Sequence, residues 1–109
     1  MWSFFMMLYE VNLKIKKEVG QSFLKWLPGH MERVLKAEGF SKASLFHGDK
    51  NENESDDLKL TVFYKVKTRE DLESYFKGYA LEMREEGLSA FPGQFEASRR
   101  IHTLIEELS

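Results

Sequence analysis

The sequence has 109 residues, 42% of them hydrophobic and 31% charged, which suits a single domain with its own core. It contains no cysteine, so disulfides, thiolate catalysis and cysteine-ligated zinc or iron–sulfur centres are excluded. The formal net charge of −2 excludes a general electrostatic attraction to nucleic acid.

The N-terminal residues 1–9 are apolar but do not resemble an export signal. No Lys or Arg precedes Lys14, no small-residue cleavage site follows, and a membrane span would need about 20 apolar residues. Met6 and Met7 can each serve as an initiator. We therefore expect a single domain over residues 7–109, a tail or start-site artefact over residues 1–6, and a cytoplasmic protein without a membrane partner.

The first predicted elements are a strand and a helix. Apolar and polar residues alternate from Met7 to Lys16, which predicts a strand with one buried face. From Lys17 to Glu38 the apolar spacing changes to that of an amphipathic helix. Proline removes an amide donor and crowds the preceding turn, so Pro28-Gly29 predicts a kink or two helices. Gly39 is expected to stop the helix.

Two strands and a second helix follow. The strands are predicted over Phe40–His47 and Leu58–Lys67. Residues 48–57 between them hold five acids, one lysine and no apolar residue, which is typical of a solvated hairpin loop. Thr68 is a good N-cap with acids in the first turn after it, so a helix should begin there, and Gly87 should end it.

The last elements are a turn and a strand. Proline and glycine at the centre of Phe91-Pro92-Gly93-Gln94 predict a type II turn. A fourth strand is predicted over Phe95–Ile105, and its changing apolar parity indicates a bulge. Right-handed crossovers arrange this order of elements as a ferredoxin-like α+β sandwich, in which both helices cover one face of a four-stranded antiparallel sheet.

The other face of the predicted sheet has no helix to cover it. We expect Leu8, Leu45 and Phe63 to lie there among polar residues. Such a face is too apolar to be wholly exposed, so it should pack against a second copy of the chain.

Residues scattered over the chain form a familiar pattern. They are Met7–Asn12, Trp26-Leu27 with His30, Val34-Leu35, Gly39-Phe40, Leu72 and Tyr75 with Ala80 and Arg84, and Phe91–Phe95 with Arg99. This pattern resembles a bacterial family of domains of unknown function, family 4286, which is placed with the dimeric α+β barrels. The resemblance covers nearly the whole chain from Met7. It implies a ferredoxin-like monomer that pairs sheet to sheet into a homodimer, and it implies no established activity.

The wider superfamily offers only a weak guide to function. Its members include cofactor-free monooxygenases, lactone isomerases, haem-degrading enzymes and ligand-sensing domains. An analogy at the level of the fold does not choose among them.

His30 is the candidate catalytic residue. It lies four residues after Trp26 on the apolar stripe, so both side chains share one helix face. Imidazole titrates near neutrality, and a histidine aimed at the sheet could act as a general base. The alternative, which we weigh more heavily, is a helix-edge histidine that caps a carbonyl or meets a carboxylate. No carboxylate that would orient it for catalysis is evident.

Four tyrosines, Tyr9, Tyr64, Tyr75 and Tyr79, fall on predicted inward faces. Buried hydroxyls need partners, so these residues either line a pocket with polar tips or form an aromatic core that satisfies itself. For any single tyrosine the core is the better prediction.

The candidate anion-binding residues are arginines. Arg84 lies at the rim of the second helix's stripe, and one of the adjacent Arg99 and Arg100 must point inward. An inward arginine beside tyrosines suits a carboxylate or phosphate ligand. The alternative is a weak surface salt bridge, for which the available acids are Glu10, Glu82, Glu85 and Glu96.

The sequence contains little that indicates a metal, cofactor or nucleic-acid site. His30, His47 and His102 lie on three different predicted elements, and no glycine-rich nucleotide motif or aromatic RNA-binding motif occurs. We expect no metal, no cofactor and no nucleic-acid partner.

Two functions of different class remain. The main prediction is a small-molecule-binding protein with a pocket between helices and sheet, lined by Trp26, Tyr64, Tyr79, Arg84 and Arg99. The alternative is a cofactor-independent monooxygenase or isomerase. There His30 would be the base, while Tyr64 and an arginine would orient a small anionic or aromatic substrate. A third reading is that aromatic side chains fill the pocket and the dimer itself is the function.

Overall fold

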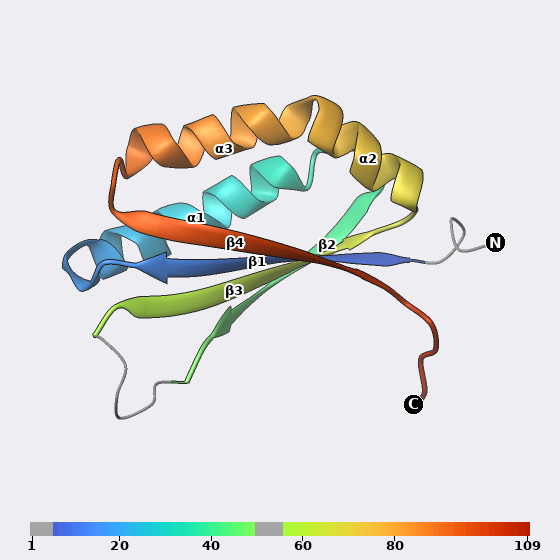
Figure 1. Ribbon diagram of the computed structural model, residues 1–109, viewed down its shortest axis with the longest axis horizontal. Helices are drawn as coiled ribbons and strands as arrows, with labels where there is room; N and C mark the ends of the chain where they lie inside the picture. The colour runs from blue at the N-terminus through green and yellow to red at the C-terminus, as the bar shows by residue number, and fades with distance from the viewer. Residues whose placement is uncertain (1–5, 50–55) are drawn as a thin grey trace.

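The computed structural model describes residues 6–49 and 56–109 (Figure 1). In chain order its elements are β1 (Met7–Ile15), a short 3-10 helix η2 (Lys17–Val19), α1 (Gly20–Val34), β2 (Phe40–His47), β3 (Leu58–Val66), α2 (Arg69–Lys77), α3 (Tyr79–Ala90) and β4 (Phe95–Thr103). Except for Met6, the expected tail lies outside the described residues, and so does most of the expected acidic loop. The predicted strands are all present.

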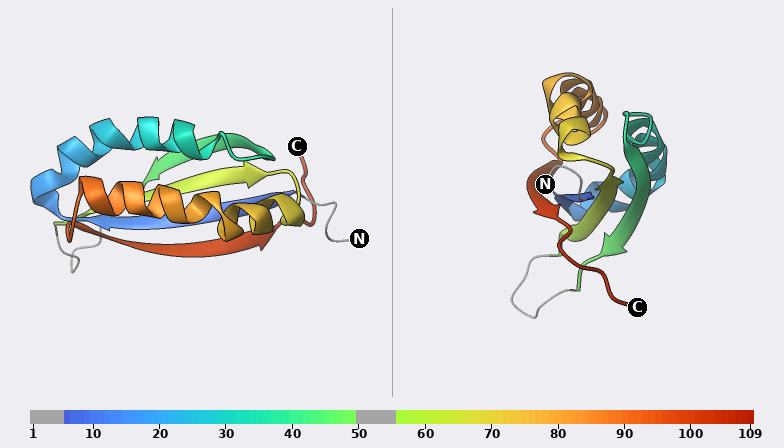
Figure 2. Two further views of the ribbon diagram at one scale, coloured as in Figure 1. Left: turned by 90° about the horizontal axis from the view of Figure 1, so that it is seen from above. Right: turned by 90° about the vertical axis from the view of Figure 1, so that its right-hand side faces the viewer.

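The four strands form one antiparallel sheet in the order β2-β3-β1-β4. The first strand is therefore central: Met7 pairs with Val66 of β3 on one side and with Thr103 of β4 on the other. The helices lie together over one face of the sheet, as Figure 2 shows from above and from the end. This arrangement is the predicted ferredoxin-like sandwich.

One strand has a different face assignment from that expected. The β2–β3 register shifts between Phe40 and Lys42, and beyond the shift Leu45 pairs with Val62 on the helix side. The prediction that Leu45 lies on the open face is therefore wrong. Phe46 lies there instead and contacts Phe63, with ring centroids 5.4 Å apart. The β1–β4 register has no such shift, so the irregularity lies in β2 and not in β4.

The first helix is one continuous helix, not two. α1 passes through Pro28, whose exposed position lets water reach the carbonyl that the missing amide leaves unbonded. It ends at Val34, before Gly39. Gly39 instead has a φ of +84° in the turn into β2, where a Cβ would collide with the Asp71 carboxylate.

The second helical region is two helices, where one was expected. Gly78 has φ −135° and ψ −86°, which are not helical values, and it separates α2 from α3. Thr68 caps α2 as predicted, because its hydroxyl accepts a hydrogen bond from the Asp71 amide at 3.1 Å. Gly87 does not end the second helix; it is buried inside α3, which continues to Ala90.

The predicted turn before β4 is confirmed. Gly93 has a φ of +68°, and the Gln94 amide donates to the Phe91 carbonyl at 3.2 Å. The turn brings the end of α3 down to the edge strand, where Phe95 begins β4.

The core lies between the helices and the sheet. Its buried members include Met7, Tyr9, Leu13, Ile15, Phe23, Leu27, Leu60, Val62, Tyr64, Val66, Leu72 and Met83. Val11 is an exception: it lies at the middle of the central strand on the helix side, yet it is only half-buried. No helix in the described part of the chain is long and apolar enough to cross a membrane.

Candidate functional site

A cavity of about 290 Å³ lies over the middle of the central strand, which explains the partial exposure of Val11. The helices contribute Phe23, Trp26, Leu27, His30, Val34, Tyr75, Met83, Arg84, Gly87 and Leu88. The sheet contributes Tyr9, Val11, Leu13, Val62, Tyr64, Phe95, Ala97 and Arg99. Arg84, Leu88 and Arg99 are exposed, so the cavity reaches the surface between α3 and β4. Its volume is near the lower limit of ordinary ligand sites.

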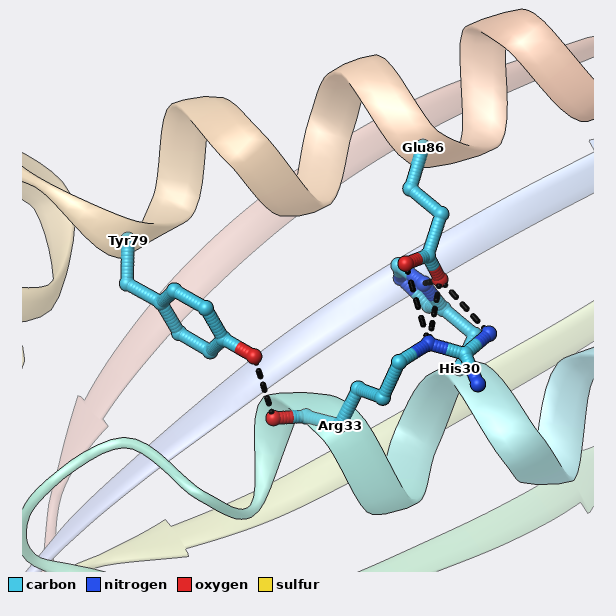
Figure 3. Close-up of polar contacts among 4 residues, drawn as sticks. All are labelled: His30, Arg33, Tyr79 and Glu86. Carbon is cyan, nitrogen blue, oxygen red and sulfur yellow. Dashed lines mark hydrogen bonds and ion pairs between the residues drawn. The ribbon is translucent and has the colours of Figure 1, made fainter.

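A bridge of polar side chains joins α1 to α3 beside this cavity (Figure 3). The Glu86 carboxylate accepts hydrogen bonds from Arg33 Nε at 2.9 Å and Arg33 Nη2 at 2.7 Å. The same carboxylate lies 2.7 Å from His30 Nδ1. About two turns before Glu86, at the start of α3, the Tyr79 hydroxyl donates to the Arg33 carbonyl at 2.9 Å. The two helices are thus fixed to each other by hydrogen bonds at two positions.

The charge of Glu86 fixes the tautomer of His30. The hydrogen bonds from Arg33 and His30 hold the pKa of the Glu86 carboxyl below its usual value, so this group is ionised at neutral pH. An ionised carboxylate only accepts hydrogen bonds, so His30 Nδ1 must carry a proton. In neutral His30 the other nitrogen, Nε2, therefore keeps a free lone pair.

Aromatic stacking holds the imidazole in place. The Trp26 and His30 rings are stacked with centroids 4.7 Å apart and planes 19° from parallel. The His30 side chain is 16% exposed. Since both residues line the cavity, the ring is fixed at its wall by Trp26 on one face and Glu86 at one edge.

Tyrosine side chains from the sheet and from α2 line the cavity. Tyr64 and Tyr75 are 3% and 6% exposed, and burial raises the pKa of both hydroxyls, which are therefore neutral. Neither hydroxyl has a hydrogen-bond partner among the described residues, nor does that of Tyr9, which is 2% exposed. Buried hydroxyls without partners are costly, and all three tyrosines line a space that could hold partners.

The two adjacent arginines of β4 point to opposite faces of the sheet. Arg99 pairs with Val11 in the register and lines the cavity. Arg100 pairs with Glu10, and its Nη1 lies 4.0 Å from the Glu10 carboxylate on the open face. The surface salt bridge considered for these arginines therefore describes Arg100, and Arg99 is the inward one.

Most of the predicted site residues lie together. Trp26, His30, Tyr64, Arg84 and Arg99 all line the cavity. Tyr79 does not: its hydroxyl turns to the end of α1.

Two residues at the site were not predicted to belong to it. Glu86 supplies the carboxylate for His30 that was not evident, and Gly87 leaves room where α3 crosses Trp26 and Phe95. Tyr75, expected either to line a pocket or to belong to an aromatic core, lines the cavity. One feature of the sequence could have indicated Glu86. In this fold an acidic residue on the inner edge of the second helix can contact a residue of the first helix.

A second histidine–glutamate pair lies on the open face. His102 Nε2 is 2.9 Å from Glu10 Oε1, and the Asn12 amide donates to Glu10 Oε2 at 2.6 Å. These contacts, Asn12 first, hold the pKa of the Glu10 carboxyl below its usual value despite burial. Within residues 6–49 and 56–109 no three His, Asp or Glu side chains gather as a metal site would require.

Solved structures with the same fold confirm the architecture. A conserved protein from Methanosarcina mazei Go1 is 19% identical, with a TM-score of 0.64 over 93% of this chain and 94% of its own. SnoaB, a cofactor-independent oxygenase from Streptomyces nogalater, is 9% identical, with a TM-score of 0.69 over 95% and 97%. A dimeric ferredoxin-like protein from an uncultured marine organism is 12% identical, with a TM-score of 0.65 over 94% and 98%.

At these identities the likeness concerns the fold alone. No curated protein sequence matches the chain. The family model of the domain of unknown function DUF4286 matches residues 6–105, nearly the whole of the fold described above. The chain belongs to the DUF4286 family.

Proposed function

We propose that this protein binds a small organic molecule in the cavity between α1, α3 and the sheet. One observation carries the proposal: Tyr64 and Tyr75 line the cavity and are more than nine-tenths buried, yet neither hydroxyl has a hydrogen-bond partner among the described residues. A ligand with polar groups would satisfy these hydroxyls. A core closed by its own aromatics would leave no such cavity.

Native mass spectrometry of freshly purified, untagged protein tests the proposal. We expect extra non-covalent mass on the wild-type protein. Ala97→Leu should remove it, because Ala97 lines the cavity, whereas Ser98→Leu, one residue along on the opposite face, should retain it. The proposal fails if the wild type carries no such mass and no compound of a fragment collection shifts the Val11 and Arg99 amide resonances.

A second candidate function is cofactor-independent enzymology, either monooxygenation or isomerisation. The specific observation that favours it is the 2.7 Å contact between His30 Nδ1 and Glu86, since this contact leaves Nε2 free to accept a substrate proton. SnoaB, which shares the fold, is a cofactor-independent oxygenase. Both reactions can begin with removal of an acidic proton from the substrate.

Deuterium exchange tests that first step. Hydroxylated aromatic acids and lactones incubated with the protein in D₂O should exchange an acidic C–H, which ¹H NMR detects. His30→Gln should abolish exchange and leave folding intact, while His102→Gln on the open face should not affect it. A rate without an ionisation near neutrality, or equal rates in both variants, would reject His30 as the base.

We also propose that the open face of the sheet pairs with a second copy of the chain. Leu8 and Phe63 lie there half-buried with no helix over them, beside the buried Glu10. A structural neighbour is a dimeric ferredoxin-like protein. A homodimer would cover this face and leave the cavity, on the other side of each sheet, accessible.

A further inference from the structure

We propose that the cavity takes an oxyanion, a carboxylate or a phosphate on a small ring compound, with its charged group held at the cavity mouth by Arg84 and Arg99. This inference rests on the proposed binding function and names the chemical class of its ligand. Three features support it: the charge of the lining, the position of Tyr75, and the apolar composition of the remaining wall.

The lining carries charge of one sign. Arg84 and Arg99 are its only charged side chains apart from the titratable His30, and no described residue in the lining is an acid. The chain as a whole has a net charge of −2, so this local excess is not a consequence of a basic protein. A cavity of low polarity strengthens the field of the two guanidinium groups on a ligand inside it.

Among the described residues the two arginines have no protein partner, unlike Arg33 and Arg100. Arg33 binds Glu86, and Arg100 lies beside Glu10. In the part of the chain that the structure describes, Arg84 and Arg99 make no ion pair and no hydrogen bond through their side chains. Because they come from α3 and β4, on opposite sides of the mouth, both forks can reach one group between them.

Tyr75 adds a neutral hydrogen-bond donor to this pair. Its side chain lines the same cavity as Arg84 and Arg99, and the charge of both guanidinium groups opposes the rise that burial causes in the pKa of its hydroxyl. The Tyr75 hydroxyl is buried and has no partner among the described residues. Two guanidinium forks and one hydroxyl donor match an oxyanion, which accepts several hydrogen bonds at once.

The apolar residues of the cavity wall indicate which kind of uncharged group the ligand carries. Phe23, Trp26, Leu27, Val62 and Phe95 offer aromatic and aliphatic surface to the same cavity. A volume of about 290 Å³ admits a body of roughly one or two rings. An apolar ring with an anionic substituent therefore satisfies both parts of the cavity.

Isothermal titration with three matched probes tests the inference: 2-naphthoate, 2-naphthyl phosphate and the neutral 2-naphthamide. We expect one or both anions to bind at least about tenfold more tightly than the amide. The stronger anion identifies the group as carboxylate or phosphate. High salt should reduce the preference, because the two arginines are exposed.

Arginine variants test whether Arg84 and Arg99 cause the preference for anions over the amide. Arg84→Gln and Arg99→Gln should each reduce the ratio of anion to amide affinity to about threefold or less, with the amide affinity unchanged. Arg100→Gln, on the adjacent residue and the opposite face, should leave the ratio as in the wild type. Amide resonances of Val11 and Ala97 should shift on binding, since both residues line the cavity.

The failures of the two proposals are distinguishable. If the amide binds in the cavity as tightly as the anions, or if Arg100→Gln has the same effect as Arg99→Gln, the oxyanion inference is overturned and the binding function stands. If none of the three probes binds at millimolar concentration, the inference is overturned. The binding function then stands or falls on the co-purified mass and its loss in Ala97→Leu.

Discussion

A histidine–glutamate pair lies on each side of the sheet, one between the helices α1 and α3 and the other on the strands β1 and β4, and the two pairs are buried differently. On the helix side, His30 is the more buried partner, with its side chain 16% exposed against 27% for Glu86. On the open face the order is reversed: the Glu10 side chain is 11% exposed and that of His102 43%. The imidazole is therefore the group held at the cavity wall, whereas on the open face the carboxylate is held against the sheet. The same chemical pair thus borders a cavity on one side of the sheet and lies on an open surface on the other.

The largest effect should come from charge on the open face. Phe63→Asp would place a carboxylate beside Glu10 in the proposed dimer interface, because these two residues pair across β1 and β3. We expect the dimer dissociation constant to rise at least about a hundredfold, since a buried unpaired charge is strongly unfavourable. Sedimentation over a dilution series measures it. The exposed Leu81→Asp on α3 is the control, and an unchanged dimer in Phe63→Asp would reject this interface.

The next largest effect is a loss of stability that should differ between Glu10 and Glu86. Glu10→Gln and Glu86→Gln should each lower the free energy of unfolding at pH 7 by about 1–2 kcal/mol, because each removes charge-assisted hydrogen bonds. The loss should be greater for Glu10, which is less exposed. Urea denaturation measures both values. A larger loss for Glu86 would contradict the comparison of burial.

Acid should weaken both pairs in the same direction. Both carboxyls have pKa values below the ordinary 4.5, so the unfolded chain binds protons at a higher pH than the folded chain. Their contribution to stability is complete above about pH 4.5 and is lost as the pH falls toward the lowered values. The urea midpoint should therefore fall below that pH, and less steeply in the double variant Glu10→Gln with Glu86→Gln. Equal slopes would show that other carboxyls are responsible.

The smallest effect on stability should come from a single methyl at the cavity. Gly87→Ala gains helix propensity, but its Cβ would lie 3.3 Å from Phe95 Cζ and press that ring toward the cavity. We expect stability within about 0.5 kcal/mol of wild type and roughly threefold weaker ligand binding. Gly29→Ala, whose Cβ would be in ordinary van der Waals contact with the Arg33 guanidinium, should gain up to about 1 kcal/mol and bind normally. Calorimetry measures both quantities, and unchanged affinity in Gly87→Ala would count against binding in this cavity.

Alternation and turn residues predicted the sheet well because each strand has one buried face. The prediction failed where local geometry depends on long-range packing. A register shift near Phe40 moved Leu45 to the helix side, and the break at Gly78 is invisible in an apolar stripe that continues across it. The sequence predicted that one of two adjacent arginines would point inward, because neighbouring residues of a strand point to opposite faces of the sheet. It did not show whether that arginine was Arg99 or Arg100.

The cavity itself could not be predicted. Trp26, His30 and Tyr64 were expected to face inward, but residue types do not determine whether side chains fill the space between them. The partner of His30 lies 56 residues away on another helix, so only the packed structure brings Glu86 to it.

The central position of β1 has a consequence for how the chain folds. Its pairing with β4 joins Met7 to Thr103, so the fourth strand is added to the sheet through contacts between residues near opposite ends of the domain. Pairing across such long separations is slow, because the entropy of closing the chain is lost before the contacts form. β4 is also the last strand to be synthesised, and it supplies Phe95, Ala97 and Arg99 to the cavity. A partly synthesised chain can therefore form the β2–β3 hairpin early, while the cavity is completed only when β4 joins the sheet.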